Sequence, residues 1–339
     1  MKKSISLQKK FQYIEDLSTA YWSSEILFAA LNMDLFTKID QGLNTTKMLA
    51  KSFACNQKEL FRFLNVLDSF ELIKNEDNTW HNSKTASTYL VSGKPSCMKD
   101  FFLYRQYMQP EWMKLIHKIS PKQHIKKPTK EDDYKERTLR YVQAMDTLVK
   151  EKITQIVEII SKSYQWNFPV LDIGGGAGSF GRAFINSKQT DPYQGHLGIL
   201  FDLLEVIEAA KTIYPDNKDW KSIKTIGDDF RTYEFTHQFG LVIMSNFLHV
   251  YSPAEAEQFV VKAVHLLKEH GVIIVHDYFP DRKGTSPHKG GLYDINMMLN
   301  TFNGECHKAS VIKKWLSDAG IQTIMVEDLS TDSSIIIAQ

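Results

Sequence analysis

The sequence is poor in cysteine, with only 3 in 339 residues. Cys55, Cys97 and Cys306 are far apart and form no C-x-x-C pair, which argues against a disulfide framework and against a zinc ribbon. Residues 1–18 carry basic side chains but lack the apolar segment of a signal peptide. No apolar run reaches the ~18–20 residues of a membrane helix. We therefore expect a cytoplasmic protein that does not enter a membrane.

The sequence also lacks an excess of charge of either sign. Its 41 Lys and Arg residues face 40 Asp and Glu residues, a formal net charge of +1. Proteins that bind nucleic acid or membrane surfaces usually have a basic bias, so neither partner is expected. An apolar content of 43% and a charged content of 24% are typical of a globular protein, and the length allows two domains.

Residues 1–110 are predicted to be mostly helical. Helical patterns over 21–39, 44–53 and 56–73 precede two extended arms around a turn at 72–83, which is the order of a winged helix. DNA binding is not favoured, because residues 1–100 hold 13 basic and 11 acidic side chains. The third helix has more large apolar residues than one buried face requires, which indicates a protein–protein surface: Leu60, Phe61, Phe63, Leu64 and Leu67.

The remainder of the chain is predicted to form a connecting region, 111–160, and an α/β domain, 161–339. Polar residues 121–136 indicate a loop, and 136–160 an amphipathic helix. Strand and helix patterns then alternate, which predicts a mainly parallel seven-stranded sheet. The expected strands are 169–173, 196–202, 223–229, 241–246, 271–277, 321–328 and 333–339, and the expected helices are 179–187, 203–214, 253–270 and 308–320.

The glycine-rich segment 168–181, FPVLDIGGGAGSFG, matches two patterns that imply different cofactors. Residues 176–181 are a G-x-G-x-x-G, the dinucleotide-binding signature. Asp172, at the end of the strand, would oppose a pyrophosphate but suits the cationic groups of S-adenosylmethionine. Glycine lets the backbone approach a ligand closely, and four glycines follow this strand: Gly174, Gly175, Gly176 and Gly178.

Polar residues also follow the later strands, where ligands of parallel sheets bind. Asp202 is placed to accept both ribose hydroxyls of an adenosine ligand, although a helix N-cap role is the alternative. Asp228 is a candidate acceptor from the adenine amino group, with Phe230 or its neighbour packed on the ring, and an Asp-rich turn explains this segment equally well. The remaining candidates for the cofactor site are Leu203, Asp229, Ser245 and Asn246.

Six ordered segments carry a family resemblance: LDIGGGAG, FDLLEVIEAA, GDDF, NFLHVYS, GVIIVHDYFP and NGECHKASVIKKWLSDAGI. Together they resemble the S-adenosylmethionine-dependent O-methyltransferases of the plant caffeate and acetylserotonin type and their bacterial small-molecule relatives. The resemblance covers essentially the whole chain. It implies a Rossmann-like domain that binds S-adenosylmethionine, which becomes S-adenosylhomocysteine after methyl transfer. It also implies an N-terminal winged-helix domain that forms a homodimer, and a small-molecule acceptor that binds beside the long helix.

The same resemblance implies that His249 is the general base. This histidine follows the strand 241–246, and the helix start at Ser252, Pro253 and Glu255 is expected to hold it firmly. The family places two acidic residues beside the base, which here are Asp277 and Glu305, although Glu305 equally fits a solvated loop acid. Plant members read His-Asp-Trp at the base, where this chain has His-Val-Tyr, and carry glutamate at the position of Asp277.

A histidine base favours an acidic hydroxyl as the methyl acceptor. The pKa gap from histidine (~6.5) to a phenol (~10) is roughly 3.5 units, about 5 kcal/mol, whereas an alkanol near ~15.7 leaves about 12 kcal/mol. The alternatives are a protein of the same fold that methylates nitrogen, sulfur or carbon or has diverged from methyl transfer, a small-molecule-sensing winged-helix regulator, and an NAD dehydrogenase. No metal set stands out. The candidate acceptor-pocket residues are Asn246 and six apolar residues whose types are more typical of a core: Phe102, Trp112, Met145, Met297, Met298 and Phe302.

Overall fold

A computed structural model describes residues 7–120, 131–188, 197–282, 289–330 and 333–339. The chain divides into two compact units, Met1–Tyr107 and Met108–Gln339. The predicted boundary at residue 110 lies close to this division, and the predicted connecting region 111–160 is part of the second unit.

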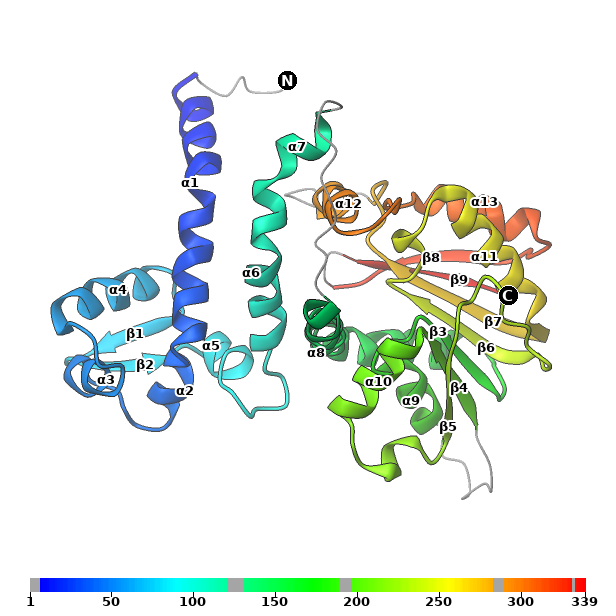
Figure 1. Cartoon of the computed structure of the whole chain (residues 1–339), viewed down its shortest axis with the longest axis horizontal. Helices are drawn as coiled ribbons and strands as arrows, with labels where there is room; N and C mark the ends of the chain where they lie inside the picture. The colour runs from blue at the N-terminus through cyan, green and yellow to red at the C-terminus, as the bar shows by residue number, and fades with distance from the viewer. Residues whose placement is uncertain (1–6, 121–130, 189–196, 283–288, 331–332) are drawn as a thin grey trace. The chain divides into compact units, whose positions relative to one another are not determined.

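The first unit has the helix and hairpin order that the sequence predicts (Figure 1). Its hairpin pairs antiparallel, and the two turn residues, Asp77 and Asn78, have φ of 48° and 61°, as a two-residue hairpin turn requires. The core packs around Trp80, which is wholly buried. The elements are α1 (Leu7–Asn32), α2 (Leu35–Asp40), α3 (Thr46–Ser52), α4 (Gln57–Ser69), β1 (Ile73–Glu76), β2 (Thr79–Asn82), α5 (Lys84–Tyr89) and the start of α6 (Lys99–Met113).

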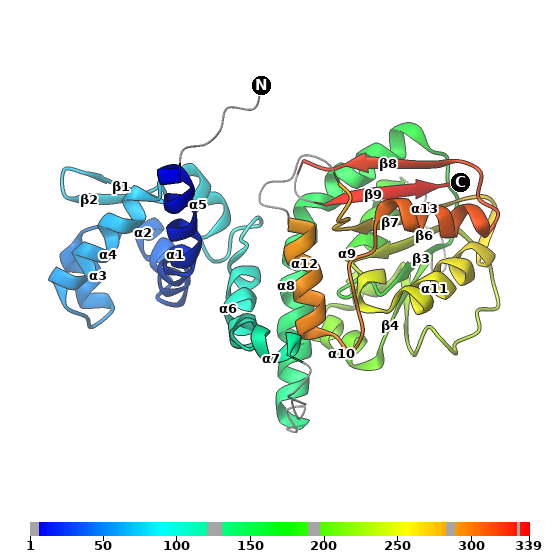
Figure 2. The ribbon, with the colours of Figure 1, turned by 90° about the horizontal axis from the view of Figure 1, so that it is seen from above.

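The second unit is a seven-stranded sheet in the order β5-β4-β3-β6-β7-β9-β8, in which β9 runs antiparallel to its two neighbours (Figures 1 and 2). All seven predicted strands are confirmed. The strands are β3 (Val170–Ile173), β4 (Gly198–Asp202), β5 (Ile223–Gly227), β6 (Phe239–Ser245), β7 (Leu267–Asp277), β8 (Ile324–Asp328) and β9 (Ser334–Ala338). The helices are α7 (Leu115–Ile119), α8 (Glu131–Ser163), α9 (Ser179–Ser187), α10 (Leu204–Ile213), α11 (Pro253–His265), α12 (Lys289–Asn300) and α13 (Ala309–Asp318), with short 3-10 turns η1 (Asn217–Trp220) and η2 (Leu248–Val250).

Two apolar cores form because successive side chains of a strand point to opposite faces of the sheet. In β3, Leu171 and Ile173 pack toward α11 and α13, whereas Val170 packs toward α8, α9 and α10. Asp172 shares the face of Val170 and therefore points toward α9. Helices cover both faces, so β3, β6 and β9 in the middle of the sheet are wholly buried, whereas the edge strand β8 is mostly exposed.

Two boundary predictions are wrong. The helix predicted to reach residue 270 ends at His265, and β7 begins at Leu267, because Leu267 pairs with Phe239 before a register shift. His270 has a φ of 60° at this irregularity, which polar residues 268–270 gave no reason to expect. The loop predicted over 121–136 lies partly outside the described residues, and 131–136 belong to α8.

The strand order reverses between β3 and β6. From β3 the chain adds β4 and β5 on one side, then crosses to add β6 and β7 on the other. The crevice at such a reversal, beyond the carboxyl ends of the strands, is where open α/β sheets bind ligands. The residues that follow β3 and β6 therefore meet at this crevice, and they are the glycine loop and the segment that contains His249.

Candidate active site

The glycine loop follows β3 and turns directly into α9. Gly174, Gly176 and Gly178 all have φ between 57° and 76°, a region that side chains with a Cβ rarely adopt. The Gly174 N–H donates to the carbonyl of Phe201 at 2.8 Å, which fixes the loop to β4. A Cβ on Gly174 would lie 2.3 Å from the Phe247 ring, whereas one on Gly176 would meet nothing within 4 Å. The loop is thus packed on one side and open at Gly176.

Asp172 lies beneath this loop and is wholly buried. Its Oδ2 accepts a hydrogen bond from the Gly181 N–H at 2.8 Å, and a Cβ on Gly175 would collide with the carboxylate. Burial raises the pKa of Asp172 to about 7, against the opposing effect of the Gly181 bond. Its Oδ1 has no hydrogen-bond partner within the described residues. Asp172 therefore supports the loop and keeps one acceptor free.

Asp202 at the end of β4 binds the glycine loop directly. Its Oδ2 accepts from the Gly176 N–H at 2.9 Å and its Oδ1 from the Leu203 N–H at 2.8 Å. Burial raises the pKa of Asp202 to about 6, although both backbone bonds favour the charged form. The N-cap residue of α10 is Leu203, so Asp202 is not the N-cap that the alternative interpretation made it.

The segment after β5 joins the same edge of the sheet. The Asp228 N–H donates to the Asp202 carbonyl at 3.0 Å, and the Asp228 side chain accepts from the Asp229 N–H at 2.7 Å. Phe230 is buried in an aromatic cluster with Phe201 and Phe247. The structure therefore assigns Phe230 to the core, and the exposed side chain of Leu203 is the apolar surface beside Asp202.

At the end of β6, Ser245 and Asn246 are held by His276 of β7. The Ser245 hydroxyl lies 2.8 Å from His276 Nδ1, and the Asn246 N–H donates to the His276 carbonyl at 2.8 Å. Burial lowers the pKa of His276 to about 3, so the ring is neutral. Asn246 has a φ of 51°, and its Oδ1 is a buried acceptor that has no partner within the described ranges.

His249 and Asp277 form a buried pair. His249 lies in η2, directly after this turn, and its Nδ1 is 2.6 Å from Asp277 Oδ1. Burial disfavours the charged form of Asp277, but His249 and the Tyr278 N–H outweigh burial and lower the pKa of the carboxyl. An ionised carboxylate only accepts hydrogen bonds, so the proton of neutral His249 is on Nδ1. Nε2 is then the basic nitrogen.

The structure places Glu305 differently from Asp277. Its side chain is 54% exposed, and its carboxylate lies 4.0 Å from His307 Nδ1. The neighbouring residue, Gly304, packs on the His249 backbone, because a Cβ there would lie 2.4 Å from the His249 carbonyl oxygen. Glu305 is thus one residue from a contact with the base segment, and its catalytic role stays a prediction.

The predicted acceptor residues are distributed over several elements. The Trp112 indole N–H donates to Asn296 Oδ1 of α12 at 3.2 Å, and Met297 of α12 is buried. Met145 of α8 is half-buried, as is Met298. The two aromatic residues Phe302 and Phe102 differ from these four. Phe302 is 85% exposed, and Phe102 packs against the core of the first unit. The acceptor role of all these residues stays a prediction.

Sequence reasoning missed a buried polar cluster that joins α8, α9 and α10. Asp146 of α8 accepts hydrogen bonds from the hydroxyls of Ser179 and Tyr214, the second at 2.7 Å, and pairs with Lys150 at 3.1 Å. Ser179 directly follows the glycine loop, and Asp146 directly follows Met145. The cluster therefore ties the long helix to the cofactor loop. Its members are too far apart in sequence to form a motif.

Two known domain families match this chain. The O-methyltransferase domain family matches residues 127–322, and the O-methyltransferase dimerisation domain family matches residues 15–92. The first match alone covers more than half of the sequence. This chain belongs to the O-methyltransferase family. The methyltransferase has its glycine loop and its His249–Asp277 pair in the matched region.

Known relatives of this O-methyltransferase are similar over most of their length. Acetylserotonin O-methyltransferase of Bos taurus is 22% identical, over 93% of each chain. The 3-hydroxy-5-methyl-1-naphthoate 3-O-methyltransferase of Streptomyces sahachiroi is 21% identical, over 92% of this chain and 89% of its own. The fold matches a crystal structure of human N-acetylserotonin methyltransferase in complex with S-adenosylmethionine, with a TM-score of 0.83, 19% identity and coverage of 100% and 99%.

Two features are absent from the described part of the methyltransferase. No group of three or more His, Cys, Asp or Glu side chains in these residues is placed to hold a metal ion. No helix among the same residues is long and apolar enough to cross a membrane. The three cysteines are free thiols.

Proposed function

We propose that this protein transfers a methyl group from S-adenosylmethionine to an acidic hydroxyl of a small molecule, with His249 as the general base. The observation that carries the proposal is the buried hydrogen bond of 2.6 Å between His249 Nδ1 and Asp277 Oδ1, beside the glycine loop. General-base catalysis needs a histidine that is oriented by a carboxylate, and His249 has such a partner on the segment that follows β6.

His249 would take up the proton that the reaction releases. Its Nε2 accepts the proton of the acceptor hydroxyl, while the hydroxyl oxygen bonds to the methyl carbon and the carbon–sulfur bond breaks. The bonding electron pair stays on sulfur, so the sulfonium becomes the neutral thioether of S-adenosylhomocysteine. Asp277 stabilises the imidazolium that forms, because its carboxylate is ionised and lies against Nδ1.

Residues at the crevice fit S-adenosylmethionine, which supplies the methyl group when bound. Asp172 Oδ1 and Asn246 Oδ1 are buried acceptors that no described residue satisfies, and a ligand ammonium supplies the missing donor. The Asp202 carboxylate keeps lone pairs for ribose hydroxyls beyond its two backbone bonds. The open space at Gly176 gives the ligand access to the loop backbone.

The base favours phenols, enols and heteroaromatic hydroxyls over aliphatic alcohols, since the proton gap to a phenol is roughly 5 kcal/mol and to an alkanol about 12. The relatives' names support hydroxyl acceptors on ring systems. Trp112, Met145, Met297 and Met298 are our candidates for the acceptor wall. The dimerisation-domain match supports a homodimer, and a cytoplasmic location stays a prediction.

A transfer screen tests the proposed reaction. Methyl-labelled S-adenosylmethionine would be incubated with the protein and matched sets of phenols, heteroaromatic hydroxyls, aliphatic alcohols, amines and thiols. We expect label on the acidic hydroxyls only, and calorimetric binding of S-adenosylhomocysteine but not of NADH. Label on amines or thiols alone would replace O-methylation with N- or S-methylation. Binding of NADH without S-adenosylhomocysteine would end the proposal.

The dimer prediction is tested on the exposed apolar face of α1. Tyr13, Ile14, Leu17, Tyr21 and Trp22 are 58–64% exposed, an unusual density of large apolar side chains. We expect the wild type to scatter light as a particle of twice the 39.1 kDa chain mass. Leu17→Glu combined with Tyr21→Glu should reduce it to one chain, because burying two carboxylates is costly.

Ser23→Glu is the matched control for the dimer test, since Ser23 is exposed on another face of the same helix. It should remain dimeric. A dimer that persists in the double variant at low micromolar concentration shows that this face is not the interface.

A further inference from the structure

The Glu255 carboxylate is a junction of three chain segments. It lies in the first turn of α11 and accepts hydrogen bonds from the Ser252 hydroxyl at 2.7 Å and from the Ser252 N–H at 3.4 Å. The same oxygen accepts from Asn303 Nδ2 at 2.8 Å, and the other oxygen accepts from Arg231 Nη2 at 2.9 Å. These bonds, from Ser252 first and then from Arg231 and Asn303, lower the pKa of Glu255 to about 2, so the group is ionised.

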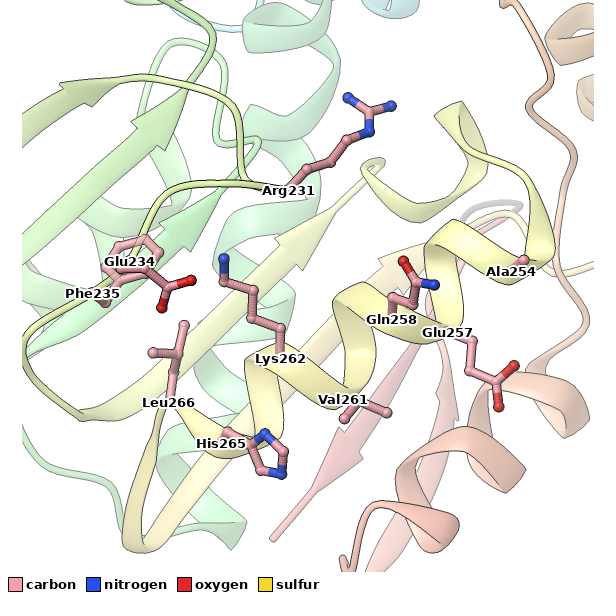
Figure 3. A pocket seen from close by; sticks show the side chains of 10 residues that line it. All are labelled: Arg231, Glu234, Phe235, Ala254, Glu257, Gln258, Val261, Lys262, His265 and Leu266. Atoms are coloured by element: carbon pink, nitrogen blue, oxygen red, sulfur yellow. The ribbon is translucent and has the colours of Figure 1, made fainter.

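Arg231 connects Glu255 with the cofactor side of the crevice. Its Nη1 pairs with Asp229 Oδ2 at 3.0 Å, and its backbone N–H donates to Asp229 Oδ1 at 2.9 Å. The guanidinium lies 5.1 Å from the centre of the Tyr251 ring, within cation–π range. Lys262 of α11, which Figure 3 shows beside Arg231 and Glu234, holds the same segment. Its Nζ donates to the carbonyls of Phe230 and Tyr233. The turn after β5 is thereby fastened to α11.

Asn303 connects Glu255 with the segment that carries Glu305. Gly304 lies directly on the His249 backbone, and its N–H donates to Thr301 Oγ1 at 2.9 Å. A shift of residues 303–305 would therefore displace the backbone of His249. Ser252 is three residues after His249 and is held by the same carboxylate. Both sides of the base segment depend on Glu255.

We propose that Glu255 is a positioning residue of the methyl-transfer site. It holds three segments in fixed positions relative to one another: the cofactor turn 228–231, the base segment 249–252 and the segment 303–305. This inference rests on the proposed function and extends it. Glu255 does not touch the reacting atoms. Its role is to keep His249 Nε2 at the distance and angle that proton transfer requires, and misplacement by about 1 Å costs on the order of 10²-fold in rate.

Glu255→Ala, Asn303→Ala and the control Glu257→Gln test this role. Glu257 is exposed two residues further along α11 and points away from Arg231 (Figure 3). We would follow amide hydrogen exchange of the full chain with S-adenosylhomocysteine, and transfer rates with an acceptor from the screen. Glu255→Ala should accelerate exchange in all three segments and lower kcat on the order of 10²-fold. The KM for S-adenosylmethionine should change less than kcat.

Asn303→Ala removes one link while leaving the cap of α11 intact. It should loosen 301–305 without changing exchange at 252–256, and lower kcat about 10-fold. Glu257→Gln should match the wild type. Faster exchange confined to 252–256 in Glu255→Ala would reduce Glu255 to an ordinary helix cap and overturn the proposal, as would an unchanged kcat. A wild type that binds no S-adenosylhomocysteine would instead contradict the proposed function, because the exchange pattern is measurable without turnover.

Discussion

Replacing His249 with alanine is expected to lower methyl transfer by about 10²–10⁴-fold, the usual contribution of a general base. The variant keeps the glycine loop, Asp202 and Asn246, so its calorimetric affinity for S-adenosylhomocysteine should equal that of the wild type. The loss should appear in kcat and not in the KM for S-adenosylmethionine, because the imidazole acts on the acceptor proton. Labelled-methyl transfer to a phenolic acceptor from the screen measures the rate.

Two companion variants separate catalysis from folding. His265→Ala changes an exposed histidine in the last turn of α11 and should leave the rate unchanged. Asp277→Asn keeps the shape of the carboxylate but places an amide against Nδ1, which favours the wrong tautomer and should also lower kcat by up to ~10⁴-fold. Undiminished turnover in His249→Ala, with the melting temperature of the wild type, would sink the general-base assignment.

The sequence predicted the strands of the second unit and the meeting of its site residues for one physical reason. Strand and helix patterns alternate, so the strands are parallel and their carboxyl ends share one edge. Asp172, Asp202 and His249 each follow or end a strand, and topology alone brings them together. The glycines mark the tight turn into α9, since only they adopt its positive φ at low cost.

Residue type could not distinguish core from site. Phe230 ends the motif GDDF and Phe302 directly precedes the motif NGECH, but Phe230 is buried among other rings and Phe302 is 85% exposed. Whether such a side chain is buried depends on its packing against distant residues, which a local sequence pattern does not reveal. The start of β7 was hidden for a similar reason, because its first residues pair with β6 across an irregular register.

The polar junctions were hidden by sequence distance. Glu255 was recognisable as part of a helix start, but its partners Arg231 and Asn303 are 24 and 48 residues away. Asp146 lies 33 residues from Ser179 and 68 from Tyr214. Each bond is a single contact between unrelated elements, so it produces no periodicity or motif, and only the three-dimensional arrangement reveals it.

Gly174→Ala should abolish cofactor binding and destabilise the second unit together. A Cβ at this position meets the Phe247 ring at 2.3 Å, and φ is +63°, so the left-handed strain of ~1–2 kcal/mol adds to overpacking of ~1–3 kcal/mol. Phe247 cannot retreat easily, because it packs against Phe230 and Phe259. Since Phe247 lies two residues before His249, the clash displaces the base segment along with the loop. Thermal melting and S-adenosylhomocysteine calorimetry measure both effects.

Gly176→Ala is the matched variant that separates the ligand contact from the packing clash. Its φ of +57° carries the same strain, but the new methyl group points into open space, so the melting temperature should fall far less than in Gly174→Ala. If the cofactor fills that space, Gly176→Ala still loses affinity for S-adenosylhomocysteine, because the methyl group occupies ligand volume and the loop can no longer approach the ligand. Wild-type affinity in Gly176→Ala would place the cofactor elsewhere on the loop. Wild-type melting and affinity in Gly174→Ala would refute the coupling of loop and base through Phe247.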